Sequence, residues 1–114
     1  MIRSSLRRGL AALVLGAALA APSAVADEPS FELVIRDHKF EPETLEVPAN
    51  ARIKLIVQNA DPTPEEFESY ELNREKVIPG NSQAIVYIGP LDPGTYPFFG
   101  EFHMDTAQGR IIAE

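Results

Sequence analysis

The stretch "GTYPFFGEFHMD", residues 94–105, is the most informative segment of this 114-residue chain. Its first half is rich in aromatic residues that favour strands, and Gly100 ends the apolar run. The turn that follows carries one imidazole, His103, and one thioether, Met104. Both groups can bind metal ions, so the segment predicts a strand that leads into a loop with two candidate metal ligands.

The first 26 residues have the pattern of a secretory signal peptide. A basic start (MIRSSLRR) precedes a short apolar run (GLAALVLGAALAA), and the small residues Ala24 and Ala26 suggest cleavage after Ala26. The run is short and Ala-rich for a membrane span, although an uncleaved N-terminal anchor is the alternative. The sequence after Arg7-Arg8 matches a twin-arginine signal poorly, so we expect Sec export. Residues 27–114 are then expected to form a periplasmic domain with no membrane insertion.

Composition narrows the classes of function. Cleavage leaves 88 residues, the size of one small domain, and removes Arg3, Arg7 and Arg8, which changes the net charge from −7 to −10. This charge disfavours nucleic acid as a partner and suits cations or a basic docking partner, or it serves solubility alone. The chain has no cysteine, which excludes disulfides, thiolate catalysis and iron–sulfur clusters. It also lacks nucleotide-binding and nucleophile-elbow motifs.

Several short segments alternate apolar and polar residues with a period of two, which predicts strands. The segment 65–80 shows no helical stripe, so we expect two short extended pieces around an irregular middle. Residues 37–44 are expected to turn the chain, because Pro42 is unsuited to a central strand. Pro and Gly separate the segments, and the pattern as a whole predicts an all-β sandwich or barrel. The expected strands cover residues 31–36, 44–48, 51–59, 81–90, 95–100 and 109–114.

Three stretches in this order resemble the cupredoxin family: "FEPETLEVPAN" (40–50), "IKLIVQN" (53–59) and "LDPGTYPFFGEFH" (91–103). The resemblance covers residues 27–114 and implies a Greek-key β-sandwich that usually holds copper at one end. In that family one histidine follows the central strand, and a Cys–His pair lies in the last loop. Here Gly100 stands in place of the cysteine and "TPEEFES" offers no histidine, so a blue copper site is excluded.

The chain resembles more sharply the small cupredoxin component of Ftr-type ferrous iron transport systems, and it is similar to the cupredoxin domain of Efe-type systems. The stretches 37–50, 63–80 and 94–103 carry this resemblance. It implies a place beside a periplasmic iron-binding protein and an inner-membrane iron permease, with possible ferroxidase-like oxidation of Fe(II). In the Efe-type domain cysteines occupy the places held here by Phe40 and Gly100, and acidic residues match Glu66 and Glu68.

His103 is the leading candidate metal ligand, although a loop histidine can also serve only as a hydrogen-bonding group. Glu66 and Glu68 lie two residues apart on an extended chain and therefore share one face, from which both can approach His103. Glu65 has the opposite parity and is a weaker candidate. Glutamates are also common as solvated surface residues, so this set alone does not establish a site. A site of imidazole and carboxylates suits iron, Cu(II), Mn(II) or Zn(II) better than Cu(I).

Three further residues complete the candidate ligand set. Glu101 is expected to support His103 from two residues away, and His38, in an early loop at the same end, is a ligand, a proton acceptor or an exposed loop residue. Met104 is a weak thioether candidate, or it fills a gap in the packing. Gly100 provides a positive φ, a close backbone approach or an open coordination position.

The sequence therefore leaves three functions open. The first is an exported protein of ferrous iron uptake that binds iron, copper or both and promotes Fe(II) oxidation for a permease. The second is a metal carrier without turnover. The third is a metal-free β-sandwich that docks on other periplasmic components through its acidic surface.

Overall fold

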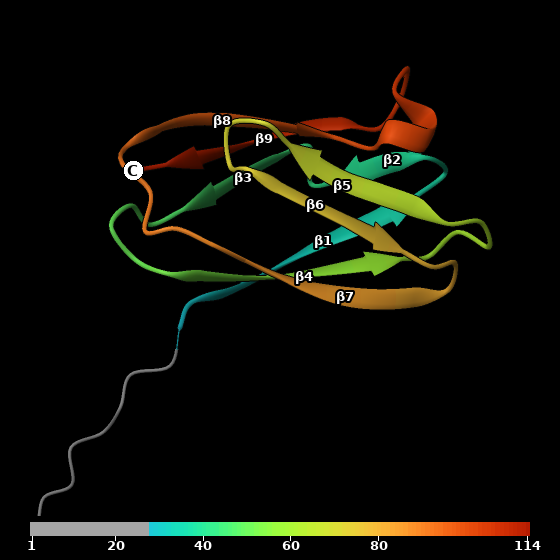
Figure 1. The fold of residues 1–114 in the computed structure, drawn as a ribbon, viewed down its shortest axis with the longest axis horizontal. Coiled ribbons are helices and arrows are strands. Elements are labelled where there is room, and N and C mark those ends of the chain that lie inside the picture. The colour runs from blue at the N-terminus through green and yellow to red at the C-terminus, as the bar shows by residue number, and fades with distance from the viewer. Residues whose placement is uncertain (1–27) are drawn as a thin grey trace, which may run out of the picture.

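Two β-sheets packed face to face make up the structure, a computed structural model that describes residues 28–114 (Figure 1). The signal segment expected at residues 1–26 lies outside the described part of the chain. One sheet has the order β2-β1-β4-β7, with β1 (Ser30–Arg36), β2 (Lys39–Glu41), β4 (Ile53–Asn59) and β7 (Ser82–Ile88). The other has the order β3-β9-β8-β5-β6, with β3 (Thr44–Val47), β5 (Glu65–Ser69), β6 (Arg74–Ile78), β8 (Gly94–Phe99) and β9 (Gln108–Ala113).

Both sheets are mixed. β1 runs parallel to β4, and β3 runs parallel to β9, whereas the other neighbouring strands are antiparallel. A short 3-10 turn, η2 (Glu101–His103), connects β8 to β9 at one end of the sandwich. The described residues contain no helix of the length and apolarity that a membrane crossing requires. The predicted all-β sandwich is therefore confirmed.

The core follows the alternation expected from the sequence. One face of each strand is buried between the sheets, because residues two apart lie on the same side of a strand. The segment 65–80 forms two strands, β5 and β6, around a turn, as expected. Residues buried in this way on the expected strands include Leu33, Ile35, Leu45, Val47, Ile53, Leu55, Val57, Val86 and Ile88.

The turn expected over residues 37–44 contains a short strand that the sequence did not predict. Residues 39–41 form the strand β2, which pairs antiparallel with β1 and places Phe40 opposite Ile35. A strand is compatible with Pro42 here because β2 lies at the edge of its sheet and ends one residue before the proline.

An aromatic cluster joins the two sheets near the end that carries η2. The ring of Phe40 on β2 meets Phe98 on β8 edge to face, with centroids 4.9 Å apart, and Phe67 on β5 lies 5.1 Å from Phe98. All three side chains are buried. His38 and Glu65 each lie two residues before a member of this cluster, so the packing of the rings helps to position both.

Asn59 at the end of β4 organises the neighbouring loops. Its Nδ2 donates to the carbonyl oxygens of Thr63 (2.8 Å) and Ile78 (3.1 Å), and its Oδ1 accepts the backbone N–H of Asp61 (3.0 Å). The residue is 1% exposed. These contacts fix the loop that leads from β4 to the start of β5.

Replacing Asn59 with Ala should therefore destabilise the fold. The change leaves buried backbone groups without partners, at a cost of about 1–3 kcal/mol. In a domain of this size each kcal/mol lowers Tm by about 4–8 °C, which thermal unfolding followed by circular dichroism measures. Gln58→Ala, on the same strand but exposed, is the matched control. Equal losses in the two variants would contradict this role for Asn59.

Candidate metal centre

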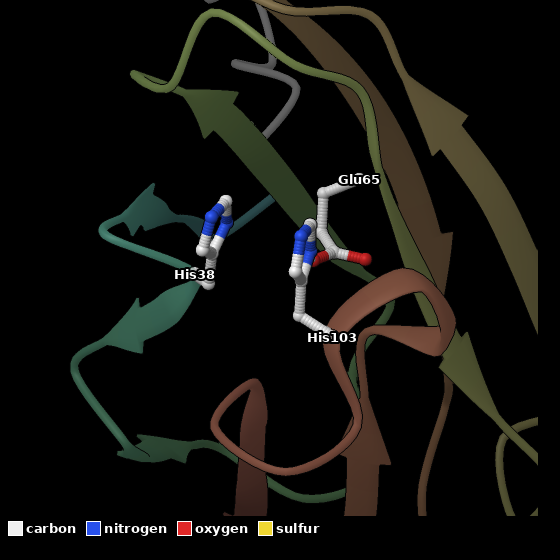
Figure 2. Close-up of side chains that lie close together, drawn as sticks. All are labelled: His38, Glu65 and His103. Carbon is white, nitrogen blue, oxygen red and sulfur yellow. The ribbon is translucent and has the colours of Figure 1, made fainter.

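Two histidines and one glutamate meet at the end of the sandwich (Figure 2). His38 comes from the turn between β1 and β2, Glu65 is the first residue of β5, and His103 is the last residue of η2. Each offers a ligand atom, and these atoms all lie within 4.8 Å of one another. The two imidazole rings are stacked, with centroids 3.5 Å apart and planes 11° from parallel.

The carboxylate of Glu65 is the fixed member of the group. Its side chain is 1% exposed. Oε1 accepts the backbone N–H groups of Glu66 (2.9 Å) and Phe102 (3.0 Å), and Oε2 lies 2.5 Å from Nδ1 of His103. Nδ1 can donate to the carboxylate in the matching tautomer, so Oε2 of Glu65 becomes free to bind a metal ion only when the His103 ring turns away from it.

Gly100 makes room for this carboxylate. A Cβ at residue 100 would lie 2.7 Å from Cδ of Glu65 and 2.8 Å from Cβ of Ala107, closer than side-chain carbons approach. The backbone has φ −102°, so the suggestion of a positive φ is wrong and that of a close approach is right. The space beside Gly100 holds the Glu65 carboxylate, so it is not an open coordination position.

His38 is positioned by Asp61. Asp37 and His38 have φ of 53° and 59°, a region that residues other than glycine seldom adopt. The Asp61 carboxylate accepts the N–H groups of Asp37 (2.8 Å) and His38 (3.0 Å), and Oδ2 lies 3.4 Å from Nδ1 of His38. The hydroxyl of Thr106 donates to the His38 carbonyl (2.6 Å) and so ties this turn to the η2 loop.

These backbone contacts also set the charge of Asp61. Burial by itself would raise the pKa of this carboxyl group. The N–H groups of His38 and Asp37, with smaller contributions from the two imidazoles, outweigh burial and hold the pKa below its usual value. Asp61 is therefore ionised next to His38.

The structure does not bring Glu66 and Glu68 to His103. Their side chains leave β5 on the opposite side from Glu65 and meet Glu101 from η2, with carboxylate oxygens within 4.8 Å of one another. The expectation that Glu66 and Glu68 share a face agrees with this arrangement. Glu101, which was expected to support His103, has its carboxylate next to those of Glu66 and Glu68.

The sequence undervalued Glu65 because strand parity does not reveal which face of a strand meets a distant loop. The signal that could have identified it is Gly100, since a residue without a side chain next to a histidine leaves space for another group. His38 was a candidate and lies in the cluster. Met104 is half exposed and lines an open pocket beside His38 and His103.

The second carboxylate group has altered acidity. Burial, together with Glu75, Glu101 and Glu68 as negative neighbours, raises the pKa of Glu66 to about 8. The pKa of Glu68 is also raised, by desolvation and then by its acidic neighbours Glu75 and Glu101. Glu66 therefore retains a proton near neutral pH when no cation is bound.

Comparison with known proteins identifies the family. A model of the cupredoxin-like domain matches residues 9–113, and the chain belongs to this family. An uncharacterized protein of Rickettsia prowazekii (strain Madrid E) is 51% identical over 81 residues, which cover 71% of this chain and 65% of the relative. The chain thus spans less than two thirds of that relative's length.

Solved structures show the same fold. Auracyanin A, a "blue" copper protein from Chloroflexus aurantiacus, has a TM-score of 0.66 at 14% identity, with 75% of this chain and 98% of auracyanin covered. Amicyanin from Paracoccus versutus has a TM-score of 0.58 at 14% identity, with 80% and 85% covered. The metal-binding domain of the Streptococcus pneumoniae Cu(I)-exporting ATPase CopA has a TM-score of 0.65 at 12% identity, with 80% of this chain and 91% of the CopA domain covered. At these identities the likeness concerns the fold alone.

The ligands present here do not fit a blue copper centre. That centre needs a cysteine thiolate with two histidines, and this chain has no cysteine. Two imidazoles and one carboxylate do fit a divalent ion such as Fe(II), Zn(II) or Cu(II). With bonds of roughly 2.0–2.2 Å, atoms on opposite sides of an ion are at most about 4.4 Å apart, and the two stacked rings have to turn apart before each can direct a nitrogen at the same ion.

The close approach at Gly100 predicts a specific loss of stability. Gly100→Ala should cost about 1–3 kcal/mol, because the added methyl group overlaps the Glu65 carboxylate and Ala107. Gly94→Ala is the matched control, since its Cβ would meet Tyr96 at an ordinary 3.7 Å. Urea unfolding of both variants measures the difference. Wild-type stability for Gly100→Ala would show that the carboxylate does not need this space.

The raised pKa of Glu66 predicts that the metal-free protein loses stability as pH rises. The unfolded chain releases this proton near pH 4.5 and the folded protein only near pH 8, so the free energy of unfolding should fall across that window. Glu66→Gln should flatten the slope and raise Tm at pH 8 by about 4–8 °C for each kcal/mol regained. Glu46→Gln, at an exposed position on β3, is the control. An unchanged slope in Glu66→Gln would refute the assignment.

Proposed function

We propose that this protein is an exported metal-binding protein of ferrous iron uptake, which binds Fe(II) through His38, Glu65 and His103 and promotes its oxidation for a partner permease. The observation that carries the proposal is the donor set. Two imidazoles and one carboxylate with open positions are a combination typical of non-haem Fe(II) sites. In this proposal Fe(II) is the cargo and substrate of the protein.

The surroundings of the three residues suit reversible handling of iron. His38 and His103 have side chains that are 44% and 30% exposed, so an ion can enter from solvent, whereas Glu65 is held beneath them. A carboxylate ligand binds Fe(III) more strongly than Fe(II), which favours loss of an electron. Each oxidised iron gives one electron to O₂, which becomes water after four such electrons and four protons, or to Cu(II), which becomes Cu(I).

The biological setting rests on the export signal and the family resemblance. A protein secreted through an N-terminal signal peptide meets iron in the periplasm, and a charge of −10 attracts cations to its surface. The proposed partners are a periplasmic iron-binding protein and an inner-membrane iron permease. An iron permease gene beside the gene for this protein would support the role. Deletion of the gene for this protein should reduce Fe(II) uptake, and unchanged uptake would contradict the role.

Metal titration tests the binding step. Calorimetry of metal-free protein should show Fe(II), under anaerobic conditions, binding more tightly than about 1 mM, which corresponds to about −4.1 kcal/mol. His103→Ala and Glu65→Gln should each weaken Fe(II) binding at least tenfold. Even the removal of a group that only supports a metal ligand typically lowers metal affinity by about that factor. Glu46→Gln should bind as the wild type does. Binding weaker than about 1 mM for Fe(II), Cu(II) and Zn(II) would refute the site.

Oxidation is measured separately from binding. Anaerobic protein loaded with Fe(II) and then exposed to O₂ or Cu(II) should lose ferrozine-reactive Fe(II) faster than a protein-free control, and His103→Ala should abolish the difference. Tight binding without faster oxidation would instead identify a metal carrier without turnover.

A further inference from the structure

A second cluster of carboxylates lies on the other side of β5 from Glu65. Glu66 and Glu68 project from the strand and meet Glu101 of η2, and their oxygen atoms lie within 4.8 Å of one another. Glu75 of β6 stands directly opposite Glu68 in the antiparallel pairing. Four acidic side chains therefore gather around one point on the outer face of this sheet.

Two oxygens of this cluster are buried without a hydrogen-bond partner. They are Oε1 of Glu66 and Oε1 of Glu68, and the Glu66 side chain belongs to a residue that is only 3% exposed. An unpartnered buried oxygen costs roughly 1–3 kcal/mol, and native proteins rarely leave two together. Glu65, on the opposite side of the strand, has partners for both of its oxygens. The missing hydrogen-bond partners are thus confined to the carboxylates on the outer side of β5.

Among residues 28–114, no basic side chain forms an ion pair with this cluster. The ion pairs found within residues 28–114 are Arg36–Glu41 and Arg52–Glu28, and the histidine–carboxylate contacts are His38–Asp61 and His103–Glu65; none includes these glutamates. Arg74 is the cationic residue next to Glu75, but its guanidinium donates to the backbone carbonyls of Tyr87 and Asn73. Buried carboxyl groups in proteins are protonated, paired with a basic group or bound to a metal ion, so a bound cation can take the place of the proton here.

We propose that Glu66, Glu68 and Glu101 form a second metal site that binds a hard, highly charged cation, and that this cation is Fe(III). All of its donors are carboxylate oxygens, which suit hard cations, and three carboxylates match a charge of three. The choice of iron rests on the proposed function, whereas the site itself rests on the geometry above. The adjacent residues Glu65 and Glu66 serve different sites because they point to opposite faces of β5.

Terbium luminescence tests the second site directly. Tb(III) prefers oxygen ligands, and Tyr70 lines the same pocket as Glu68 and Glu75, so it can sensitise the bound ion. The wild type and the His103→Ala variant should bind Tb(III) with similar affinity. The double variant Glu66→Gln, Glu68→Gln should bind at least tenfold more weakly, and Glu46→Gln should match the wild type.

Folding and the first site are checked in the same double variant. Its circular dichroism spectrum and its affinity for Zn(II) at His38, Glu65 and His103 should be unchanged. Equal Tb(III) affinity in the double variant and the wild type would mean that Tb(III) binds surface carboxylates at random, which overturns the proposal. An equal loss in His103→Ala would also overturn it, since the two clusters would then be one site.

The identity of the cation is tested by competition. Fe(III) supplied as citrate should displace Tb(III) from the wild type, and failure to do so would overturn the assignment of Fe(III). Failure of the proposed function has a different signature, namely the absence of Fe(II) and Zn(II) binding that depends on His103. The two results can therefore be told apart.

Discussion

The contact between the Glu65 carboxylate and the backbone at Gly100 is the constraint on which this end of the molecule depends. A side chain at residue 100 would overlap the carboxylate. Without one, Glu65 reaches the N–H of Phe102 and Nδ1 of His103, and thereby fixes the η2 loop against β5. The same contact places a hard oxygen donor in the space next to the loop position where the family resemblance implies a sulfur donor. An oxygen donor in place of a sulfur donor suits harder ions than Cu(I).

The alternation of β5 separates two kinds of environment within two residues. Glu65 faces the stacked imidazoles, and Glu66 faces Glu68 and Glu101. The turn η2 contributes to both sides, since its first residue meets the carboxylates and its last residue meets Glu65 and His38. A strand and a turn of three residues therefore position a nitrogen-containing site and an all-oxygen site next to each other. In the proposed iron chemistry the first suits Fe(II) and the second Fe(III).

The supports around the first site are local and polar. Asp61 holds the left-handed turn at Asp37 and His38 through two backbone N–H groups, and Asn59 in turn holds the backbone of Asp61. The aromatic cluster of Phe40, Phe67 and Phe98 fixes the strands below. A site supported in this way is positioned before an ion arrives, apart from the rotation that parts the two rings.

The sequence by itself determined the class of fold and all the strands except the short β2, because a period of two and the positions of Pro and Gly are local properties of the chain. It also identified His103 and His38 as candidates and excluded blue copper, because ligand chemistry follows from residue type. The pairing of Glu65 with His103 depended on the tertiary structure. Which face of β5 meets the η2 loop is set by how the two sheets pack, and residues 65 and 103 come together only across that packing.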